Sequence, residues 1–115
     1  MLDTMSSRGE LEQRVMELLW TATEPMSVAD VHATLTQERE LAYTTVMTVL
    51  DRLAKKDLVD RELVNRAWQY TPRSSQAEVI SRDIMRLFDG VPSEVRVEAL
   101  QLLAEKLPEA ATVVP

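Results

Sequence analysis

The chain has 115 residues, of which 45% are hydrophobic and 28% are charged, and its formal net charge is −6. This length suits one domain, or one domain with a short appendage, and the hydrophobic fraction is enough to build a core. The absence of cysteine excludes disulfides, thiolate catalysis and cysteine-based zinc sites. We find neither a signal peptide nor an apolar run long enough to span a bilayer, and we expect a soluble cytoplasmic protein with no membrane partner.

The negative charge is unevenly spread along the chain. Residues 1–42 hold three cations against eight anions, and residues 74–115 hold four against seven. Residues 43–73 hold six cations against four anions and form the one positive segment. Nucleic-acid-binding domains usually have a basic surface. The net charge of the whole chain therefore argues against a nucleic-acid partner, whereas residues 43–73 are a candidate site for binding one.

The first predicted helix covers residues 8–21. Its apolar side chains recur at i, i+4, i+7 and i+8, which places them on one face: Leu11, Val15, Leu18 and Leu19. Acidic residues in its first turn suit the positive end of the helix dipole. Trp20, near the end of this helix, is expected to fill the core.

A second helix is predicted over residues 28–37, with Ser27 as its N-cap and Asp30 as the partner in a weaker version of the capping box. His32, the only histidine, lies beside the apolar stripe of this helix. Because no partner ligand is nearby in the sequence, we expect a structural or solvated histidine, and neither a metal site nor a cofactor.

The stretch from Leu41 to Val59 predicts a third helix with two different faces. At 100° per residue its core-facing stripe lies at i, i+3, i+4 and i+7: Val46, Val49, Leu50 and Leu53. The opposite side carries small hydroxyls first and positive charge in the last turns. Two short helices, a tight connection and this third helix form a helix-turn-helix pattern. In such a pattern short hydroxyl side chains approach base edges, and cations near the end of the helix reach phosphates. The alternative is a surface helix whose polar residues are merely solvated.

After this helix the periodicity becomes that of a hairpin over residues 58–71. Asp57 and Asn65 stand where a left-handed backbone is expected, which both residue types tolerate. A hairpin directly after a recognition helix is the wing of a winged helix-turn-helix. We expect Arg61 and Arg66, near its tip, to contact phosphates or the minor groove. The alternative is a hairpin whose exposed arginines have no such role.

Two further helices are predicted in the C-terminal part. One covers residues 76–88 and is capped by Ser74 or Ser75, and the other runs from a cap at Ser93 to about Leu107. The second is apolar on two adjoining flanks, which is more surface than one neighbouring helix can cover. We expect a second copy of the chain to bury it, and the alternative is that both helices fold back on the winged domain.

The run AYTTVMTVLDRLAKKDLV, followed by a charged turn and RAWQYTP, closely resembles the penicillinase-repressor family of bacterial winged-helix proteins (BlaI, MecI and the copper-responsive CopY). LEQRVMELLW, EPMSVADVH and the helical C-terminus fit the same pattern, so the resemblance covers nearly the whole chain. It implies a mainly α fold, with a winged helix-turn-helix of three helices plus a β-hairpin wing over residues 1–73 and C-terminal dimerisation helices over residues 74–115. It also implies a homodimer that represses transcription at inverted repeats with TACA and TGTA half-sites.

Site residues follow from the resemblance and from the helical faces. Base contacts fall on the first half of the third helix, at Tyr43, Thr44, Thr45, Met47 and Thr48. Contacts to the DNA backbone fall on Arg52, Lys55, Lys56 and Arg66, to which the hairpin pattern adds Arg61. The expected dimerisation surface comprises Ile80, Ile84, Leu87, Phe88, Val97, Leu100, Leu103 and Leu107.

The chain departs from the family pattern at positions that bear on its inducing signal. Without cysteine it lacks the cysteine-rich C-terminus of the copper-responsive branch. Its only phenylalanine, Phe88, follows Leu87, so the Asn-Phe bond that is cleaved in the antibiotic-resistance branch is absent. We expect a regulator of the antibiotic-resistance type, with a sensor protease as a candidate partner and the inducing signal open.

No enzymatic activity is expected, because one histidine, no cysteine and two glycines provide little for hydrolytic or nucleotide chemistry. Two other functions fit the sequence. A winged-helix protein-interaction module would use the acidic first 42 residues and would bind DNA weakly even at low salt. A small-molecule-responsive regulator with a divergent operator would hold an apolar pocket between its dimerisation helices.

Overall fold

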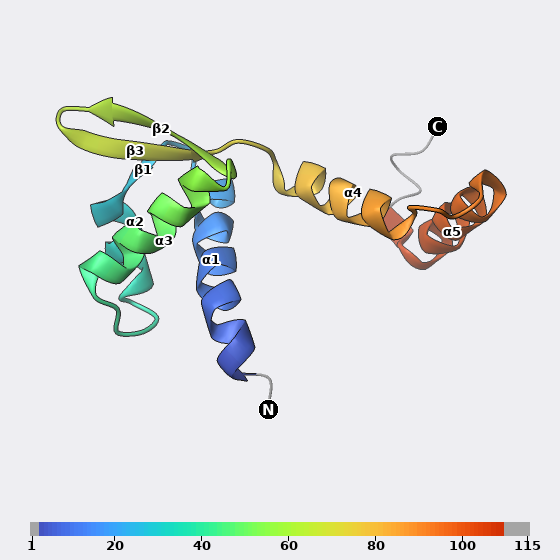
Figure 1. Ribbon diagram of the computed structural model, residues 1–115, viewed down its shortest axis with the longest axis horizontal. Helices are drawn as coiled ribbons and strands as arrows, with labels where there is room; N and C mark the ends of the chain where they lie inside the picture. The colour runs from blue at the N-terminus through green and yellow to red at the C-terminus, as the bar shows by residue number, and fades with distance from the viewer. Residues whose placement is uncertain (1–2, 110–115) are drawn as a thin grey trace. The chain divides into compact units, whose positions relative to one another are not determined.

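Figure 1 shows the computed structural model, which describes residues 3–109, with side chains from residue 9 onward. In chain order the elements are α1 (Asp3–Thr21), β1 (Met26–Ser27), α2 (Val28–Leu35), α3 (Tyr43–Lys55), β2 (Val59–Val64), β3 (Ala67–Pro72), α4 (Gln76–Leu87) and α5 (Ser93–Lys106). The chain divides into two compact units, Met1–Glu78 and Val79–Pro115. The functional division after residue 73 stays a prediction.

The first three helices and the sheet enclose one hydrophobic core. α3 supplies the predicted stripe, and all four of its residues are buried: Val46, Val49, Leu50 and Leu53. α1, α2 and the sheet supply the rest of the core: Val15, Met16, Leu19, Val28, Val31, Leu35, Val59 and Tyr70. Because the stripe of α3 faces inward, the opposite side of the helix is left exposed. Three helices followed by a hairpin confirm the predicted winged helix-turn-helix.

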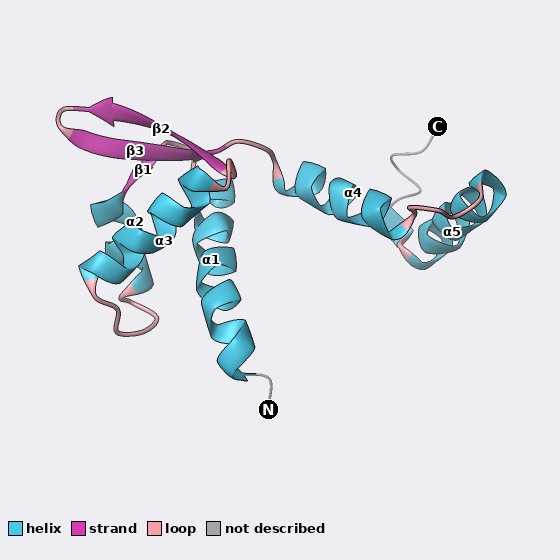
Figure 2. Cartoon of the chain, in the orientation of Figure 1, coloured by secondary structure: helices cyan, strands magenta, loops and turns pink. Residues whose placement is uncertain are grey.

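The wing, which is the hairpin of β2 and β3, belongs to a three-stranded antiparallel sheet with the order β1-β3-β2 (Figure 2). Val64 pairs with Ala67, so the turn consists of Asn65 and Arg66. Their φ angles are 52° and 70°, the two positive values that a type I′ turn requires. The left-handed backbone expected at Asn65 is confirmed, and Arg66 shares it.

Strand β1 was not predicted from the sequence. In this short strand Met26 pairs with Tyr70 and Ser27 pairs with Gln69. Two residues are too few to produce an alternating pattern of apolar and polar side chains, so periodicity gives no sign of it. This pairing joins the start of α2 to β3, the middle strand of the sheet.

Two helix ends form as the sequence predicts. Ser27 caps α2, because its hydroxyl accepts the Asp30 N–H at 3.0 Å while the Asp30 carboxylate accepts the Ser27 N–H at 3.0 Å. After α3, Asp57 takes the left-handed conformation with φ 62°, and the Leu58 N–H donates to the Leu53 carbonyl at 3.0 Å. This bond is the mark of a Schellman motif, which satisfies the last carbonyls of the helix.

Three local predictions are wrong. α1 already begins at Asp3, because a helix that has nucleated extends at little cost through polar residues. Trp20 does not fill the core but packs half-buried at its edge, where its indole N–H donates to the Ser74 carbonyl at 2.9 Å. Ser93 is the first residue of α5 and not its cap, since the N-cap position is held by Pro92, which makes no side-chain hydrogen bond.

α4 and α5 contain no buried residue. α4 is capped by Ser75, whose hydroxyl accepts the Glu78 N–H at 3.1 Å and whose own N–H donates to the Glu78 carboxylate at 2.8 Å. Gly90, in the turn after α4, has a φ of 78°, which glycine adopts without strain. In the part of the chain that the structure describes, no helix is long and apolar enough to cross a membrane.

Candidate nucleic-acid interface

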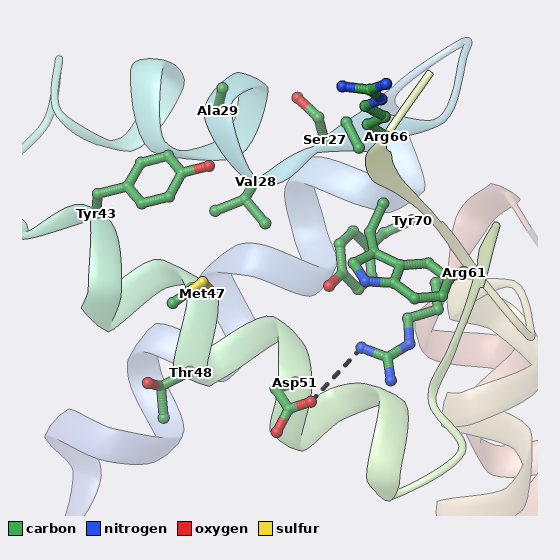
Figure 3. Close-up of a pocket in the computed structure, with 12 residues that line it drawn as sticks. Ser27, Val28, Ala29, Tyr43, Met47, Thr48, Asp51, Arg61, Arg66 and Tyr70 are labelled. Atoms are coloured by element: carbon green, nitrogen blue, oxygen red, sulfur yellow. Dashed lines mark ion pairs between the residues drawn. The ribbon is translucent and has the colours of Figure 1, made fainter. Parts of the chain in front are cut away.

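A groove of about 550 Å³ lies between the start of α2, the first half of α3 and the wing. Figure 3 shows Met47 and Thr48 on α3, with Arg66 on the wing and Ser27 at the start of α2. The lining combines apolar and aromatic side chains with a few polar and charged ones. Such a surface admits a partner that presents both flat apolar groups and negative charge.

The first half of α3 presents what we call the reading face, which comprises Tyr43, Thr44, Thr45, Met47 and Thr48. All five side chains are exposed, with Tyr43 at 47% and Met47 at 44%. They are the residues for which base contacts were predicted, and the buried stripe on the other side of α3 is what turns them to solvent. The structure therefore brings these five residues together, while their role stays a prediction.

His32 supports the start of the reading face from α2. Its Nε2 lies 2.9 Å from the Leu41 carbonyl oxygen, to which it donates. Its ring also meets the Tyr43 ring edge-on, with centroids 5.5 Å apart. This histidine holds the connection between α2 and α3, which agrees with the structural role expected from the sequence. No group of side chains able to hold a metal ion occurs among the described residues.

The Thr48 hydroxyl is already engaged inside the helix. It donates to the Thr44 carbonyl oxygen at 2.9 Å, a back-bond that threonine commonly makes in helices. With its only hydroxyl hydrogen used, Thr48 offers a partner its methyl group and an acceptor oxygen. On α3 this favours apolar contact through the methyl group over donation of a hydrogen bond.

The start of α3 is less negative than the starts of other helices. α2, α4 and α5 carry Asp30, Glu78 and Glu94 in their first turns, whereas α3 carries no acid there. Its N-cap is Ala42, which makes no side-chain cap. Within the first turn of α3 no acid compensates the positive end of the helix dipole, which favours an approaching anion such as phosphate.

The predicted backbone-contacting cations near the end of α3 differ in their surroundings. Lys55 is 75% exposed and lies 3.0 Å from Asp51. The Nζ of Lys56 lies 2.9 Å from a carboxylate oxygen of Glu12 on α1. Arg52 is half-buried and makes no ion pair with any residue that the structure describes. Lys55 and Arg52 are therefore more available to a new partner than Lys56.

Arg61 does not lie near the tip of the wing, contrary to expectation. It pairs with Tyr70 in the middle of the hairpin, its guanidinium lies 3.5 Å from Asp51 on α3 (dashed line in Figure 3), and its Cζ lies 4.6 Å from the centre of the Trp68 ring. The pKa of Asp51 is lowered mainly by its hydrogen bond with Lys55 and further by the charge of Arg61. Sequence spacing carries no sign of this contact between α3 and the wing.

Arg66 lies at the tip of the wing, as predicted. It is exposed and makes no ion pair among the described residues. Its backbone φ of 70° belongs to the left-handed region, which costs a residue with a Cβ free energy that glycine avoids. The turn thus presents a cationic side chain where glycine would suit the backbone better.

The predicted dimerisation residues lie on α4, on α5 and directly after them. Leu87 is 79% exposed and Leu100 is 50% exposed. Of the other predicted residues Ile84 and Phe88 are half-buried, and the rest are exposed: Ile80, Val97, Leu103 and Leu107. The structure leaves this apolar surface uncovered, and its partner stays a prediction.

Comparison with known proteins gives a consistent result. The sequence pattern of a family described as penicillinase repressor matches residues 8–111. Two proteins named transcriptional regulator BlaI, from the Mycobacterium tuberculosis strains CDC 1551 and H37Rv, are 51% identical to the chain over 73 residues, which is 64% of this chain and 53% of theirs. The chain thus spans about half the length of these curated relatives.

Two solved structures share the fold at low sequence identity. The match to the complex structure of hsRosR-S1 covers 90% of this chain and 93% of the hsRosR-S1 chain. The match to a MarR protein from Peptoclostridium difficile DA00132 covers 97% of this chain and 81% of the MarR chain. Both have a TM-score of 0.52 and 17% identity. At this identity the likeness shows the winged-helix fold alone.

Proposed function

The chain belongs to the penicillinase-repressor family of transcriptional regulators, and we propose that it is a sequence-specific DNA-binding repressor. It acts as a homodimer on an inverted repeat with TACA and TGTA half-sites. The winged unit of each chain, which we define as α1, α2, α3 and the three-stranded sheet, binds one half-site, with α3 in the major groove and the wing at the flanking backbone or minor groove.

The observation that carries this function is the reading face of α3 exposed beside a wing that ends in Arg66. Thymine presents a C5-methyl group in the major groove, and threonine methyls and Met47 offer it apolar contact. The small side chains of Thr44, Thr45 and Thr48 let the helix backbone come close to the base edges. Base recognition therefore depends on shape complementarity and on contacts between methyl groups as much as on hydrogen bonds.

Backbone contacts come from the two ends of this surface. Arg66 extends from the wing tip and makes no ion pair among the residues that the structure describes, and Arg52 and Lys55 lie in the last turns of α3. Lys56 joins them once it leaves Glu12, an exchange of one surface ion pair for another that costs little. Because each phosphate contact releases counterions, the affinity for DNA falls steeply as salt rises.

Pairing of two chains involves the apolar side chains of α4 and α5. Leu100 and Val97 on α5 are each about half exposed, and no side chain on either helix is buried. Exposed apolar patches of this kind mark interfaces in soluble proteins. A symmetric pair of chains also matches the two-fold symmetry of an inverted repeat.

The signal that releases the repressor belongs to the antibiotic-resistance type in this proposal, with a sensor protease as the partner. The similarity to regulators named BlaI supports this branch. Phe88 follows Leu87 in this chain, so cleavage uses a bond other than Asn-Phe. A protease that releases the chain from DNA by cutting within residues 74–115 would support this part of the proposal, and cutting elsewhere would contradict it.

The test is an anisotropy titration of a labelled duplex that carries the TACA/TGTA inverted repeat. A scrambled duplex of the same composition is the control, and both are titrated at two salt concentrations. We expect the repeat to be preferred at near-physiological salt by about 1,000-fold or more, the lower end for specific DNA-binding proteins. Equal weak binding to both duplexes would contradict the proposal and favour a protein-interaction module.

A further inference from the structure

We propose that Asp51, Arg61 and Trp68 form a clamp that fixes the wing against α3, which makes Arg61 a positioning residue for DNA recognition and not a phosphate contact. Asp51 comes from α3, while Arg61 and Trp68 come from the two strands of the wing. The inference rests on the proposed function, since DNA is the ligand whose recognition the clamp serves. It assigns Arg61 a different role from the one expected from the sequence.

The clamp lies on the side of the wing that faces α3. Arg61 is paired with Tyr70, which is 2% exposed and packs in the core, and Leu63 is paired with Trp68. Side chains alternate along a strand, so all four of these side chains lie on one face of the hairpin. Arg61 and Trp68 are diagonal neighbours on that face, close enough for the guanidinium to stack on the indole.

Beyond Tyr70 the wing has no buried side chain to hold it. Leu63 is 58% exposed and Trp68 is 41% exposed, so hydrophobic packing does not fix the outer half of the hairpin. Among the ion pairs of the described residues, the one between Arg61 and Asp51 joins the wing to α3. The pairing of β1 with β3 holds the wing only as far as Gln69, so beyond that residue the position of the wing tip relative to the reading face depends on this contact.

The charge of Asp51 supports the same assignment. A carboxylate on the exposed side of α3 disfavours DNA unless cations neutralise it. Lys55 on the same helix and Arg61 on the wing are the charged groups that face it. The guanidinium of Arg61 is thus used twice within the protein, on a carboxylate and on an aromatic face, and it would have to leave both to reach a phosphate.

The clamp and a direct phosphate contact predict opposite effects of Asp51→Asn. If Arg61 contacted phosphate, removing Asp51 would free the arginine, delete a negative charge and tighten specific binding. If Arg61 positions the wing, the same change loosens the wing. Binding to a scrambled duplex then rises slightly, because a negative charge is lost, while the preference for the inverted repeat falls.

The first readout needs no DNA. In the full chain with Trp20→Phe, Trp68 is the sole source of tryptophan fluorescence, and acrylamide quenching reports its exposure. We expect Arg61→Gln and Asp51→Asn each to raise the quenching and shift the emission to the red. The matched controls are Arg66→Gln, which changes a wing arginine outside the clamp, and Lys55→Gln, which removes the other partner of Asp51, and both leave the quenching unchanged.

The second readout is the preference ratio between the inverted repeat and the scrambled duplex. Arg61→Gln and Asp51→Asn are each expected to lower it about tenfold, the combined scale of an exposed cation–π contact and a surface ion pair. The double variant is expected to lower it no further, because either change alone opens the clamp. Additive losses, a higher ratio in Asp51→Asn, or unchanged quenching in Arg61→Gln would each overturn the clamp.

The two readouts separate failure of the clamp from failure of the proposed function. A wild-type chain without preference for the repeat, whose Trp68 quenching still responds to Arg61→Gln, would overturn the repressor function and support the clamp. A chain that prefers the repeat and keeps this preference in Arg61→Gln would support the repressor function and overturn the clamp.

Discussion

The winged unit and the C-terminal helices treat their apolar side chains in opposite ways. In the winged unit, helices and sheet bury a set that includes Val15, Val31 and Leu50 at 0% exposure. In α4 and α5 no side chain is buried, and Leu87, Val97 and Leu100 are half exposed or more. One region thus completes a core from its own residues, whereas the other leaves its apolar side chains exposed.

The stabilities of the two regions should therefore depend differently on protein concentration. A core formed within one chain is equally stable at any protein concentration. A surface that another chain covers is stabilised by mass action, so its stability rises with concentration. Changes in the winged unit should therefore alter folding of the single chain, while changes in α4 and α5 should alter association.

The largest expected effect comes from Leu50→Ala, which removes a fully buried side chain from α3. We expect the winged unit to lose about 2 to 5 kcal/mol of unfolding free energy, the range for such truncations in cores. Urea denaturation at two protein concentrations measures it, and Leu100→Ala is the matched control. If the control lost as much stability at low concentration, the contrast between the two regions would be wrong.

A charged residue at the centre of α5 should disrupt the association of chains through the C-terminal helices. Leu100→Glu is expected to yield monomers, because a charge in an apolar interface is costly to bury. Without the second binding unit, affinity for the inverted repeat should fall about 100-fold, the low end of the gain from linked sites. Light scattering and operator titration measure both effects. Dimers that persist in this variant would place the interface elsewhere.

Substitutions at Thr48 separate the role of its methyl group from the role of its hydroxyl. Thr48→Ser keeps the hydroxyl and loses the methyl group, and we expect specific binding to weaken by about 1 kcal/mol, the low end for one lost base contact. Thr48→Val keeps a methyl group and loses the hydroxyl, which the helix carbonyl of Thr44 already engages, so affinity should change little. The reverse order of the two variants in an anisotropy titration would show that the hydroxyl reads the base.

Lys55→Ala provides the contrasting variant on the same helix. Lys55 is 75% exposed, and loss of one phosphate contact should weaken binding to repeat and scrambled duplexes alike. The slope of log affinity against log salt should fall by about 0.9. Thr48→Ala should instead reduce specific binding and leave the slope unchanged. Identical behaviour of the two variants would remove the division between base reading and backbone contact.

The smallest expected effect is a gain in stability of the winged unit alone. Asp57 holds a left-handed backbone with φ 62° after α3, and glycine adopts this conformation more easily. Asp57→Gly should raise the unfolding free energy by about 0.5 to 1 kcal/mol, which is the left-handed penalty that glycine avoids less the extra chain entropy that glycine loses on folding. Loss of the weak pairing of Asp57 with Arg73 at 3.5 Å reduces this gain. Thermal denaturation checks this, and a loss of stability would mean that the ion pair outweighs the backbone.

Features set by neighbours in sequence could be predicted well. The inward stripe of α3, the capping box of Ser27 and Asp30, and the left-handed Asp57 and Asn65 all depend on residues within one or two turns. Periodicity and local backbone preference determine such features. The exposure of the five residues of the reading face follows from the same periodicity, because the apolar stripe faces the core and these residues lie on the opposite side of α3.

Features set by residues distant in sequence could not be predicted. Lys56 meets Glu12 across 44 residues, and Trp20 meets Ser74 across 54. Arg61 meets Asp51 only because the hairpin folds back over α3. Spacing patterns describe one element at a time, so the partners of these charged and polar groups appear only once the elements are packed.

In the proposed function two chains, each with one winged unit, bind one inverted repeat. Sedimentation of the saturated complex on a duplex with both half-sites tests this most directly. We predict two chains per duplex, and affinity about 100-fold weaker when one half-site is scrambled, because the second contact is then lost. One chain per duplex, with equal affinity for the intact and the half-scrambled repeat, would contradict the account.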